Sequence, residues 1–588
     1  MVLFSSRKTE FKSPFGAVEV GQTICFNFPV DEKLRADGVS LFYRNHFSGE
    51  IFEVSLKKTG AEGTYDIFSA QYVFKEEGVY FYRFEIYAGK KTFYVGRDED
   101  GNAIVGDWLP EWQQTVVKKG FSTPDFVKGG LIYHIFADRF NRVGEFPDAP
   151  YRVKKNWDDP LTLCDPDGVY RANDVYGGNF KGITAKIPYL EELGVTMIYL
   201  SPIFSSHSNH RYDTGDYTTL DSVLGTEEDF REMVECAEKH GIGVMLDGVF
   251  NHTGADSIYF NEFGRYPSVG AYQSVDSPYR NWFTFHEDGG YDCWWGCTNV
   301  PTVRRDCKEF QEFIAGEGGV VEKWLRAGIK AWRLDVVDEL SSEFVEKIRD
   351  RIKSVSPDAL LIGEVWEDAT TKVSYSEKRR YFLGNQLDGV MNYPYKDAIL
   401  ELVRSGDAQK FVRIVNHIAE IYPKCCLDVS MTMLGSHDTK RALTELADVG
   451  YMDDKSKVEK RDFRLDEYQY ARAKKRLMLA SAIEYFLPGV PSVYYGDERG
   501  MQGFEDPLNR CPLKVTPDKE LFEHYRFLGM VRKTMREEFI KCADISVTEE
   551  GVLVIARGKV VLYANPTTEV KRYVKGELPA YSFQISKR

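Results

Sequence analysis

Hydrophobic and polar positions alternate along the first part of the chain with the period of β-strands. In the run GVYFYRFEI, apolar side chains occupy every second position, at Tyr80, Tyr82, Phe84 and Ile86, and would share one face of a strand. Turns that contain glycine separate several similar runs. The pattern predicts an all-β segment over residues 1–121, which we interpret as an N-terminal β-sandwich.

Beyond this segment, short apolar runs alternate with stretches of helical period. The eight candidate strands are LIYHIFA from Leu131, VTMIYLS from Val195, IGVMLDG from Ile242, IKAWRLD from Ile329, ALLIGE from Ala359, LDGVMN from Leu387, DVSMTMLG from Asp428 and PSVYYG from Pro491. The last helix shows an apolar stripe at Leu521, Tyr525, Leu528, Val531 and Met535. Alternating strands and helices imply parallel pairing, and eight units predict an α/β fold, a closed (β/α)8 TIM barrel.

Three further segments set the domain boundaries that we expect. Residues 122–130 have the Pro and Gly content of a linker, so a barrel over residues 122–540 follows. After the third strand, about sixty residues rich in Tyr, Trp, Gly and Asn predict an inserted subdomain over about 253–310, on the face where loops shape access. Apolar runs near the end predict a small C-terminal β domain over residues 541–588.

Composition narrows the class of partner. The net charge of −14 disfavours nucleic acid and anionic membranes as main partners. Aromatic residues make up 14% of the chain, including 35 Tyr and 9 Trp, and aromatic faces stack on sugar rings. The opening residues lack a signal-peptide pattern, and no apolar stretch is long enough to span a membrane, so we expect a cytoplasmic protein.

The ten cysteines are scattered, which is typical of reduced thiols. Cys293 and Cys297 could form half of a metal site, but no second pair accompanies them. We therefore predict no metal ligands.

Four blocks each begin as an apolar run and reach a carboxylate: DGVFNH, WRLDVVDE, LIGEVWED and LGSHDTKR. Their carboxylates are Asp247, Asp335, Glu364 and Asp438, at intervals of 88, 29 and 74 residues. A single such carboxylate would be read as the N-cap of the next helix. Four in series are hard to attribute to capping alone, and barrel strands place their last side chains in an active site.

The order and the residues of these blocks resemble those of the sequence motifs of the α-amylase superfamily of retaining α-glucosidic enzymes. The phrases YDTGDY at Tyr212–Tyr217, LDGVMNYP at Leu387–Pro394 and GMQGFEDPLNR at Gly500–Arg510 are most similar to the neopullulanase, cyclomaltodextrinase and amylopullulanase branch. The resemblance covers roughly residues 120–540.

The resemblance implies roles for three carboxylates. Asp335 would be the nucleophile and Glu364 the general acid/base, with the two carboxyl groups about 5 to 5.5 Å apart as in retaining enzymes. Asp438 would hydrogen-bond the hydroxyls of the distorted sugar ring. Independently of the family, Arg333 lies two residues before Asp335 on the same strand face and can keep it ionised. Glu364 follows the more apolar strand, where a carboxyl group more readily keeps its proton.

The same resemblance marks the residues that would bind substrate. They are Tyr212, His252, Arg333, Trp366, Glu367, His437 and Arg510, with Asp247 and Asp213 in supporting roles. Tyr212 would stack on the ring, and His252 and His437 would add polar contacts to it. Relatives that accept α-1,6 as well as α-1,4 bonds carry a Trp at the position of Trp366, which favours broad linkage tolerance. Asp247 is interpreted as a support for Arg333.

The resemblance leaves the cofactor and the oligomeric state open. The segment DRFNRVGE lacks the Asn/Asp cluster that holds calcium in many relatives, so we expect no required cofactor and leave calcium undecided. In relatives, the N-terminal module serves starch binding or dimer formation, so a homodimer through that module stays open, as does a passive packing role.

The resulting expectation is a hydrolase of maltooligosaccharides, cyclodextrins or pullulan fragments, with α-glucan oligosaccharides as its partners. A transglycosylase on the same substrates is the alternative within enzymes, since only the arrival of water or sugar distinguishes the two. A noncatalytic carbohydrate-binding scaffold is the alternative from another class, and the retention of Asp335, Glu364 and Asp438 disfavours it. A nucleotide-binding barrel is disfavoured because no phosphate-binding Gly-rich loop follows the late strands.

Overall fold

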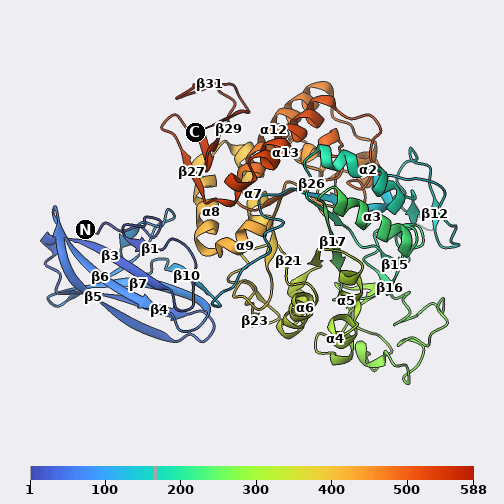
Figure 1. The fold of residues 1–588 in the computed structure, drawn as a ribbon, viewed down its shortest axis with the longest axis horizontal. Helices are drawn as coiled ribbons and strands as arrows, with labels where there is room; N and C mark the ends of the chain where they lie inside the picture. The colour runs from blue at the N-terminus through green and yellow to red at the C-terminus, as the bar shows by residue number, and fades with distance from the viewer. Residues whose placement is uncertain (1, 165–168, 588) are drawn as a thin grey trace. The chain divides into compact units, whose positions relative to one another are not determined.

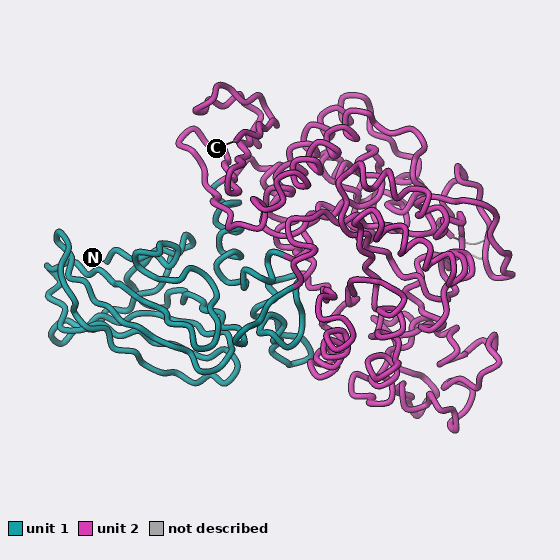
Figure 2. Tube along the Cα trace, in the orientation of Figure 1, with its two compact units in different colours: residues 1–123, 367–389, 409–428 teal, residues 124–366, 390–408, 429–588 magenta. Residues whose placement is uncertain are grey.

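The computed structural model describes residues 2–164 and 169–587 of the chain. These residues form two compact units (Figure 2). The first contains residues 1–123, 367–389 and 409–428, and the second contains residues 124–366, 390–408 and 429–588. The first unit therefore includes two segments that come from the middle of the chain.

The eight predicted strands close into a parallel barrel in chain order, which confirms the predicted fold class. They are β11 (Ile132–Ile135), β14 (Met197–Leu200), β17 (Gly243–Gly248), β20 (Ala331–Leu334), β21 (Leu360–Val365), β24 (Gly389–Asn392), β25 (Met431–Met433) and β26 (Val490–Tyr494) (Figure 1). The barrel closes because β11 pairs with both β14 and β26. These strands read as apolar runs because both faces are covered.

Side chains alternate between the two faces of each barrel strand, so every second side chain points into the barrel. Met245, Ala331 and Leu360 belong to one buried apolar cluster inside the barrel. Because side chains alternate between strand faces, Arg333 projects to the same side as Ala331, one layer nearer the carboxyl ends. The same rule places Asp247 above Met245. The carboxyl ends of the strands thus carry a polar layer on an apolar base.

The helices cover the barrel strands and fill the connections between them. Several of these helices begin at a capping residue. Thr226 and Asp229 form a capping box at the start of α3, as Asp466 and Gln469 do for α12. The α-helices are α1 (Ala137–Phe140), α2 (Phe180–Glu192), α3 (Glu227–Lys239), α4 (Lys308–Ala315), α5 (Val320–Arg326), α6 (Ser342–Val355), α7 (Tyr393–Ser405), α8 (Ala408–Ile421), α9 (Lys424–Val429), α10 (Ala442–Glu445), α11 (Lys457–Asp462), α12 (Glu467–Phe486), α13 (Lys519–Thr534) and α14 (Arg536–Ile540).

The predicted stripe of the last barrel helix lies on α13. Leu521, Tyr525 and Leu528 are buried, and Val531 is half-buried. Met535 falls just beyond the end of the helix. The stripe therefore stops one turn earlier than its spacing suggests.

Two barrel connections carry strands of their own. After β14, the strands β15 (Phe204–Ser206) and β16 (Thr214–Leu220) form an antiparallel pair that the sequence did not reveal. After β17, the long inserted region contains the hairpin of β18 (Cys293–Trp294) and β19 (Cys297–Pro301). The short pairs β12 (Val153–Lys154) with β13 (Asp174–Val175) and β22 (Val373–Ser374) with β23 (Glu377–Lys378) lie in further loops.

The N-terminal segment is a largely antiparallel sheet whose apolar faces meet. Its strands are β1 (Lys12–Ser13), β2 (Val18–Glu19), β3 (Thr23–Asp31), β4 (Gly38–Asn45), β5 (Ile51–Glu62), β6 (Tyr65–Val73), β7 (Gly78–Ala88), β8 (Lys91–Arg97), β9 (Ala103–Val105) and β10 (Trp112–Val117). Alternate residues of β7 are buried, as predicted. Phe28 of β3 stacks on Phe84 of β7 at 4.2 Å although the two strands are not paired, so the sheet folds over its core.

The chain ends in the predicted small antiparallel sheet. Its order is β27 (Ala543–Val547), β28 (Leu553–Arg557), β29 (Val560–Asn565) and β32 (Ser582–Lys587), with the hairpin of β30 (Lys571–Tyr573) and β31 (Gly576–Leu578) beside it. Arg557 of β28 is buried and donates to the carbonyl oxygens of Phe486 and Lys541. These bonds join the sheet to the end of α12 and to the segment after α14.

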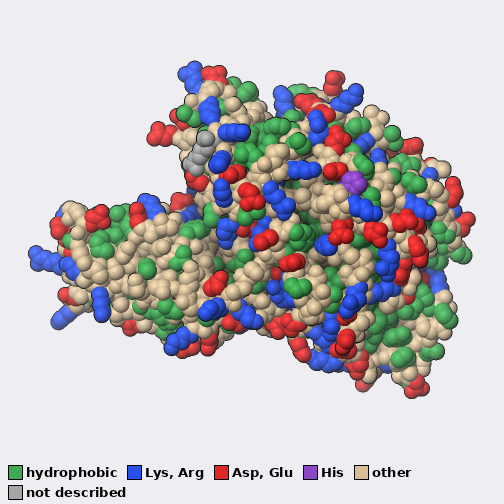
Figure 3. All heavy atoms as spheres, in the orientation of Figure 1, with side chains coloured by type: hydrophobic (Ala, Val, Ile, Leu, Met, Phe, Trp, Pro, Cys, Tyr) green, Lys and Arg blue, Asp and Glu red, His purple; other side chains and the backbone are tan. Residues whose placement is uncertain are grey.

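The surface mixes charges of both signs. Acidic and basic side chains are interspersed across the face shown in Figure 3. Within residues 2–164 and 169–587, every helix is too short or too polar to cross a bilayer.

Candidate active site

The candidate site lies at the carboxyl ends of the barrel strands and is organised around Arg333. The guanidinium of Arg333 is fully buried. It contacts Asp247 at 2.7 Å, Asp335 at 2.9 Å and Glu364 at 2.7 Å. Three neighbouring strand ends, those of β17, β20 and β21, thus present their carboxylates to one cation.

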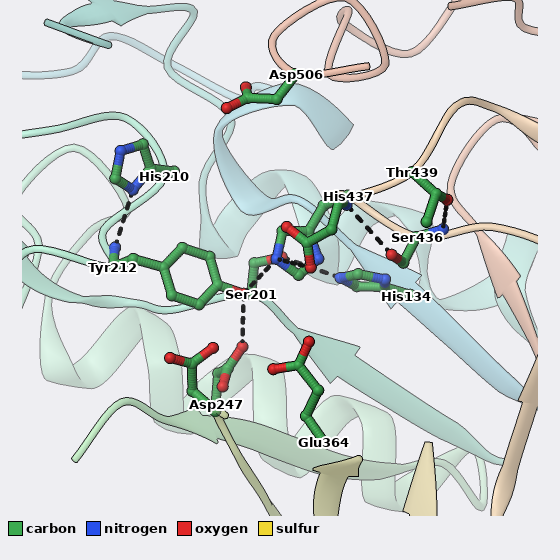
Figure 4. Close-up of polar contacts among 12 residues, drawn as sticks. His134, Ser201, His210, Tyr212, Asp247, Glu364, Ser436, His437, Thr439 and Asp506 are labelled. Atoms are coloured by element: carbon green, nitrogen blue, oxygen red, sulfur yellow. Dashed lines mark hydrogen bonds and ion pairs between the residues drawn. The ribbon is translucent and has the colours of Figure 1, made fainter. Parts of the chain in front are cut away.

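Each of these carboxylates has further partners that fix its direction. Asp247 accepts hydrogen bonds from the hydroxyls of Tyr199 at 2.7 Å and Tyr212 at 2.9 Å. Glu364 accepts from the backbone N–H of Val336 at 2.9 Å and from the indole N–H of Trp366 at 3.0 Å. Figure 4 shows Asp247 and Glu364 side by side beneath the hydroxyl end of Tyr212. Both oxygens of Glu364 are therefore held before substrate arrives.

Asp335 follows β20 directly, and the chain turns sharply after it. Its N–H donates to the carbonyl oxygen of Gly248 at 3.1 Å, which extends the β17–β20 pairing by one residue. Val336 then adopts a left-handed backbone with φ 35° and ψ 58°. This conformation is a rare one for a β-branched residue, and such outliers gather at functional sites.

Asp438 follows β25 and is more open than Asp335 and Glu364, with 32% of its side chain exposed. Arg510 lies 3.5 Å from one carboxylate oxygen and His437 lies 3.2 Å from the other. Arg510 also donates to the carbonyl oxygen of His437 at 3.0 Å and pairs with Asp506 at 2.9 Å. Arg510 therefore positions the segment that carries Asp438.

A buried layer of rings supports this segment. The rings of Tyr212 and His437 stack, 6° from parallel, and the hydroxyl of Tyr212 lies 2.5 Å from His437 Nε2. Since that hydroxyl donates to Asp247, His437 Nε2 must carry the proton and donate to the Tyr212 oxygen. Burial, reinforced by His134 and Arg510, lowers the pKa of His437 well below its usual range, so the ring is neutral.

The positive charges near the buried carboxyl groups do not fully offset the effect of burial on their pKa values. Burial raises the pKa of Asp335 well above its usual range, Arg333 opposes that rise, and Glu364 reinforces it. Burial likewise raises the pKa of Asp438 to about 7, with Glu364 adding repulsion and Arg510 opposing. Burial also raises the pKa of Asp247, against the attraction of Arg333. The attraction of Arg333 opposes the rise in the pKa of Asp335 but does not outweigh the effect of burial.

Two other predicted residues act on the loops around the site. His252 points its Nε2 at the carbonyl oxygen of Tyr212 at 3.1 Å, and burial lowers the pKa of His252 to about 4. Asp213 is buried and accepts from the hydroxyls of Ser206 and Ser208. Asp213 thus fixes the β15–β16 connection that carries Tyr212.

Trp366 and Glu367 have different surroundings. Trp366 stacks on Tyr393 with ring centres 4.0 Å apart, and 48% of its surface is exposed. Glu367 is assigned to the other compact unit and pairs there with Lys372. The structure brings Trp366 to the carboxylate cluster through its bond to Glu364, and the binding role of Glu367 stays a prediction.

Sequence reasoning missed several polar residues of the site. His134 of β11 lies 3.0 Å from Ser201 and stacks on Tyr199 at 4.3 Å. His134 alternates with Ile132 on the inward face of its strand, and that alternation was the available signal. Tyr393, in the predicted MNYP block, could have been found in the same way.

No metal cluster accompanies these residues. Among residues 2–164 and 169–587, no group of three or more His, Cys, Asp or Glu side chains is placed so that it could hold a metal ion. Cys293 and Cys297 occupy the two strands of the β18–β19 hairpin as free thiols.

The parallel eight-stranded barrel, with Asp247, Asp335 and Glu364 at adjoining strand ends, has the architecture of a barrel glycosidase. The chain belongs to the α-amylase family, whose catalytic-domain model matches residues 134–549.

Relatives and solved structures agree with this assignment. Amylopullulanase from Thermoanaerobacterium saccharolyticum is 33% identical over 594 residues, covering 91% of this chain and 44% of that protein. Neopullulanase 2 from Thermoactinomyces vulgaris is also 33% identical, covering 70% of this chain and 64% of its own. The structure of cyclic α-maltosyl-(1→6)-maltose hydrolase from Arthrobacter globiformis matches with a TM-score of 0.66 and 25% identity, over 79% of this chain and 100% of that one. The chain spans between 30% and 44% of the length of three amylopullulanases.

Proposed function

We propose that the protein is a retaining α-glucan hydrolase that cleaves α-1,4 and also α-1,6 glucosidic bonds of maltooligosaccharides, cyclodextrins or pullulan. The observation that carries the proposal is the sharing of Arg333 by Asp335 and Glu364, which come from the adjacent strand ends of β20 and β21. One guanidinium that contacts both carboxylates holds them close together, as a retaining mechanism requires.

The two carboxyl groups would act in two displacements. In the first, an Asp335 oxygen bonds to the anomeric carbon while the bond to the leaving oxygen breaks, and Glu364 gives that oxygen its proton. In the second, Glu364 takes a proton from water, and the water oxygen replaces Asp335 at the anomeric carbon. The indole N–H of Trp366 and the N–H of Val336 hold Glu364 in place for both steps.

Asp438 would bind the hydroxyls of the ring under attack. Its carboxylate is more exposed than those of Asp335 and Glu364, so it is the most accessible of these three groups to a bound sugar. A hydrogen bond to a ring hydroxyl strengthens as positive charge develops on the ring, so it stabilises the transition state more than the ground state.

The proposed substrates rest on relatives and on Trp366. The names amylopullulanase, neopullulanase 2 and cyclic α-maltosyl-(1→6)-maltose hydrolase all point to α-glucans with α-1,6 linkages. Trp366 presents a flat, half-exposed ring next to Glu364, where a leaving sugar could approach at more than one angle.

The test is product analysis on pullulan, γ-cyclodextrin, maltotriose and soluble starch side by side. Panose from pullulan would show α-1,4 cleavage, and maltotriose would show α-1,6 cleavage. NMR of the first products should show the α anomer, and an initial β anomer would overturn the retaining mechanism. Products longer than maltotriose, formed from maltotriose, would indicate transfer to sugar in place of hydrolysis. A cytoplasmic location stays a prediction, and a homodimer through the N-terminal module stays open.

A further inference from the structure

The hairpin of β18 and β19 presents an unusual residue at its tip. Trp295 and Gly296 form the two-residue turn, with φ 52° and φ 82°. Two successive left-handed residues are the mark of a type I′ turn, whose first position favours Asn, Asp or Gly. A bulky indole in that position is strained, and 81% of its surface is exposed. The turn alone does not explain why a tryptophan stands there.

The indole of Trp295 is nevertheless fixed. Its N–H donates to Glu339 Oε1 at 2.9 Å. Glu339 is only 8% exposed and also accepts from the side chain of Asn251 at 3.2 Å. Glu339 lies in η3 (Val337–Glu339), the short helix that follows Asp335. A buried carboxylate therefore holds an exposed ring in one orientation.

The hairpin as a whole is tied to the loop that carries His252. Backbone N–H groups of Thr253 and Ala255 donate to Pro301 and Asn299 of the hairpin strand, at 3.1 and 2.9 Å. His252 itself bridges to Thr302, and Trp294 lies beside its ring with centres 5.5 Å apart. The tip is thus a rigid extension of the strand ends of β17 and β20.

We propose that Trp295 is a stacking platform for one glucose unit of a bound α-glucan, at a position beyond the ring that Asp335 attacks. The inference rests on the proposed function and deepens it. The attacked ring already has its own partners in Tyr212 and Asp438, so the platform serves a neighbouring unit of the same chain. Pyranose rings have flat apolar faces that pack on indoles, and an immobilised ring loses little conformational freedom on binding.

Chain length is the property that this platform controls. A short oligosaccharide that fills only the positions around Asp335 and Glu364 would not reach Trp295. A longer one would reach it and gain affinity. Trp295 is thus a positioning residue for substrate length and takes no part in the bond-breaking step.

The experiment measures kcat/KM on maltohexaose and on maltotriose, and compares their ratio among variants. Trp295→Gly keeps the left-handed turn and removes the ring, and it should lower the ratio about tenfold without lowering the melting temperature. Trp295→Phe keeps a ring but loses the tether to Glu339, and should fall between the wild type and Trp295→Gly. Trp108→Ala removes a fully exposed tryptophan from the other compact unit and is the matched control.

The outcomes separate this inference from the proposed function. An unchanged ratio in Trp295→Gly, with normal cleavage of both sugars, would overturn the inference alone. An equal loss on both sugars would overturn it as well, since a platform for one distant unit cannot act on a sugar that does not reach it. Wild-type protein that neither binds nor cleaves maltohexaose would overturn the proposed function and the platform together.

Discussion

The backbone N–H of Val336 donates a hydrogen bond to Glu364 Oε2 over 2.9 Å, and Val336 makes this contact from a left-handed backbone. Such a conformation costs roughly 1 to 3 kcal/mol for a residue other than glycine. The strained residue immediately after Asp335 therefore orients Glu364.

Val336→Gly should relax this strain at the expense of rate. Glycine adopts positive φ freely, so the free energy of unfolding should not fall by more than the small loss from removing a half-buried side chain. The N–H becomes less firmly placed, and we expect kcat to drop about three- to tenfold. Urea unfolding and steady-state kinetics on maltotriose check both. A variant that is both less stable and fully active would contradict this reading.

Removal of either reacting carboxylate should nearly abolish activity. Asp335→Asn and Glu364→Gln should each lower kcat at least about a thousandfold, because each removes a group used in bond making or breaking. Circular dichroism should show the fold intact. The exposed pair Asp288→Asn and Glu287→Gln makes the same chemical changes elsewhere on the surface and should keep near-native rates. Near-native rates in the first pair would refute the assigned roles.

The free energy of unfolding should change with pH as Asp438 titrates. Its pKa is raised from 3.8 to about 7, chiefly by burial, so between these values the folded state binds more protons than the unfolded state. The contribution of Asp438 to stability is therefore present at low pH and is lost as pH rises from about 4 through 7.

Asp438→Asn should remove the loss of stability that the ionisation of Asp438 causes as pH rises. The difference in unfolding free energy between the variant and the wild type should shift in favour of the variant as pH rises from 4.5 to 8, as measured by urea unfolding. Comparison with the wild type at each pH cancels the opposite trend from buried neutral histidines such as His252. A difference that stays constant across this range would show that Asp438 does not titrate there.

Trp366→Ala should change linkage preference. The indole forms one wall beside Glu364 and donates to its Oε1, so its loss should alter the ratio of α-1,6 to α-1,4 cleavage on panose. Trp366→Phe keeps the stacking on Tyr393 and loses only the donor, so it should preserve the ratio better than Ala. An unchanged ratio with a lowered melting temperature in Trp366→Ala would reduce Trp366 to a packing residue.

Local pattern was sufficient for the barrel but not for the contacts between its loops. Each barrel strand was predictable because burial on both faces gives a short apolar run, and alternation then placed Arg333 beside Asp335. The left-handed Val336 was not predictable, since its side chain type favours extended backbone. Nor was the pairing of Trp295 with Glu339, whose partners lie 44 residues apart and follow no period.

The first compact unit has a consequence for anyone who would cut or exchange parts of this chain. Gln113 donates to Thr370 at 2.9 Å, Thr115 donates to the carbonyl oxygen of Ile421 at 2.6 Å, and Arg7 pairs with Glu420 at 3.1 Å. The sheet is therefore interlocked with two segments encoded between barrel strands. Removal of residues 1–123 would leave the polar groups of those two segments without their hydrogen-bonding partners. A sheet taken from a relative would present different partners to them unless both segments were exchanged together with the sheet.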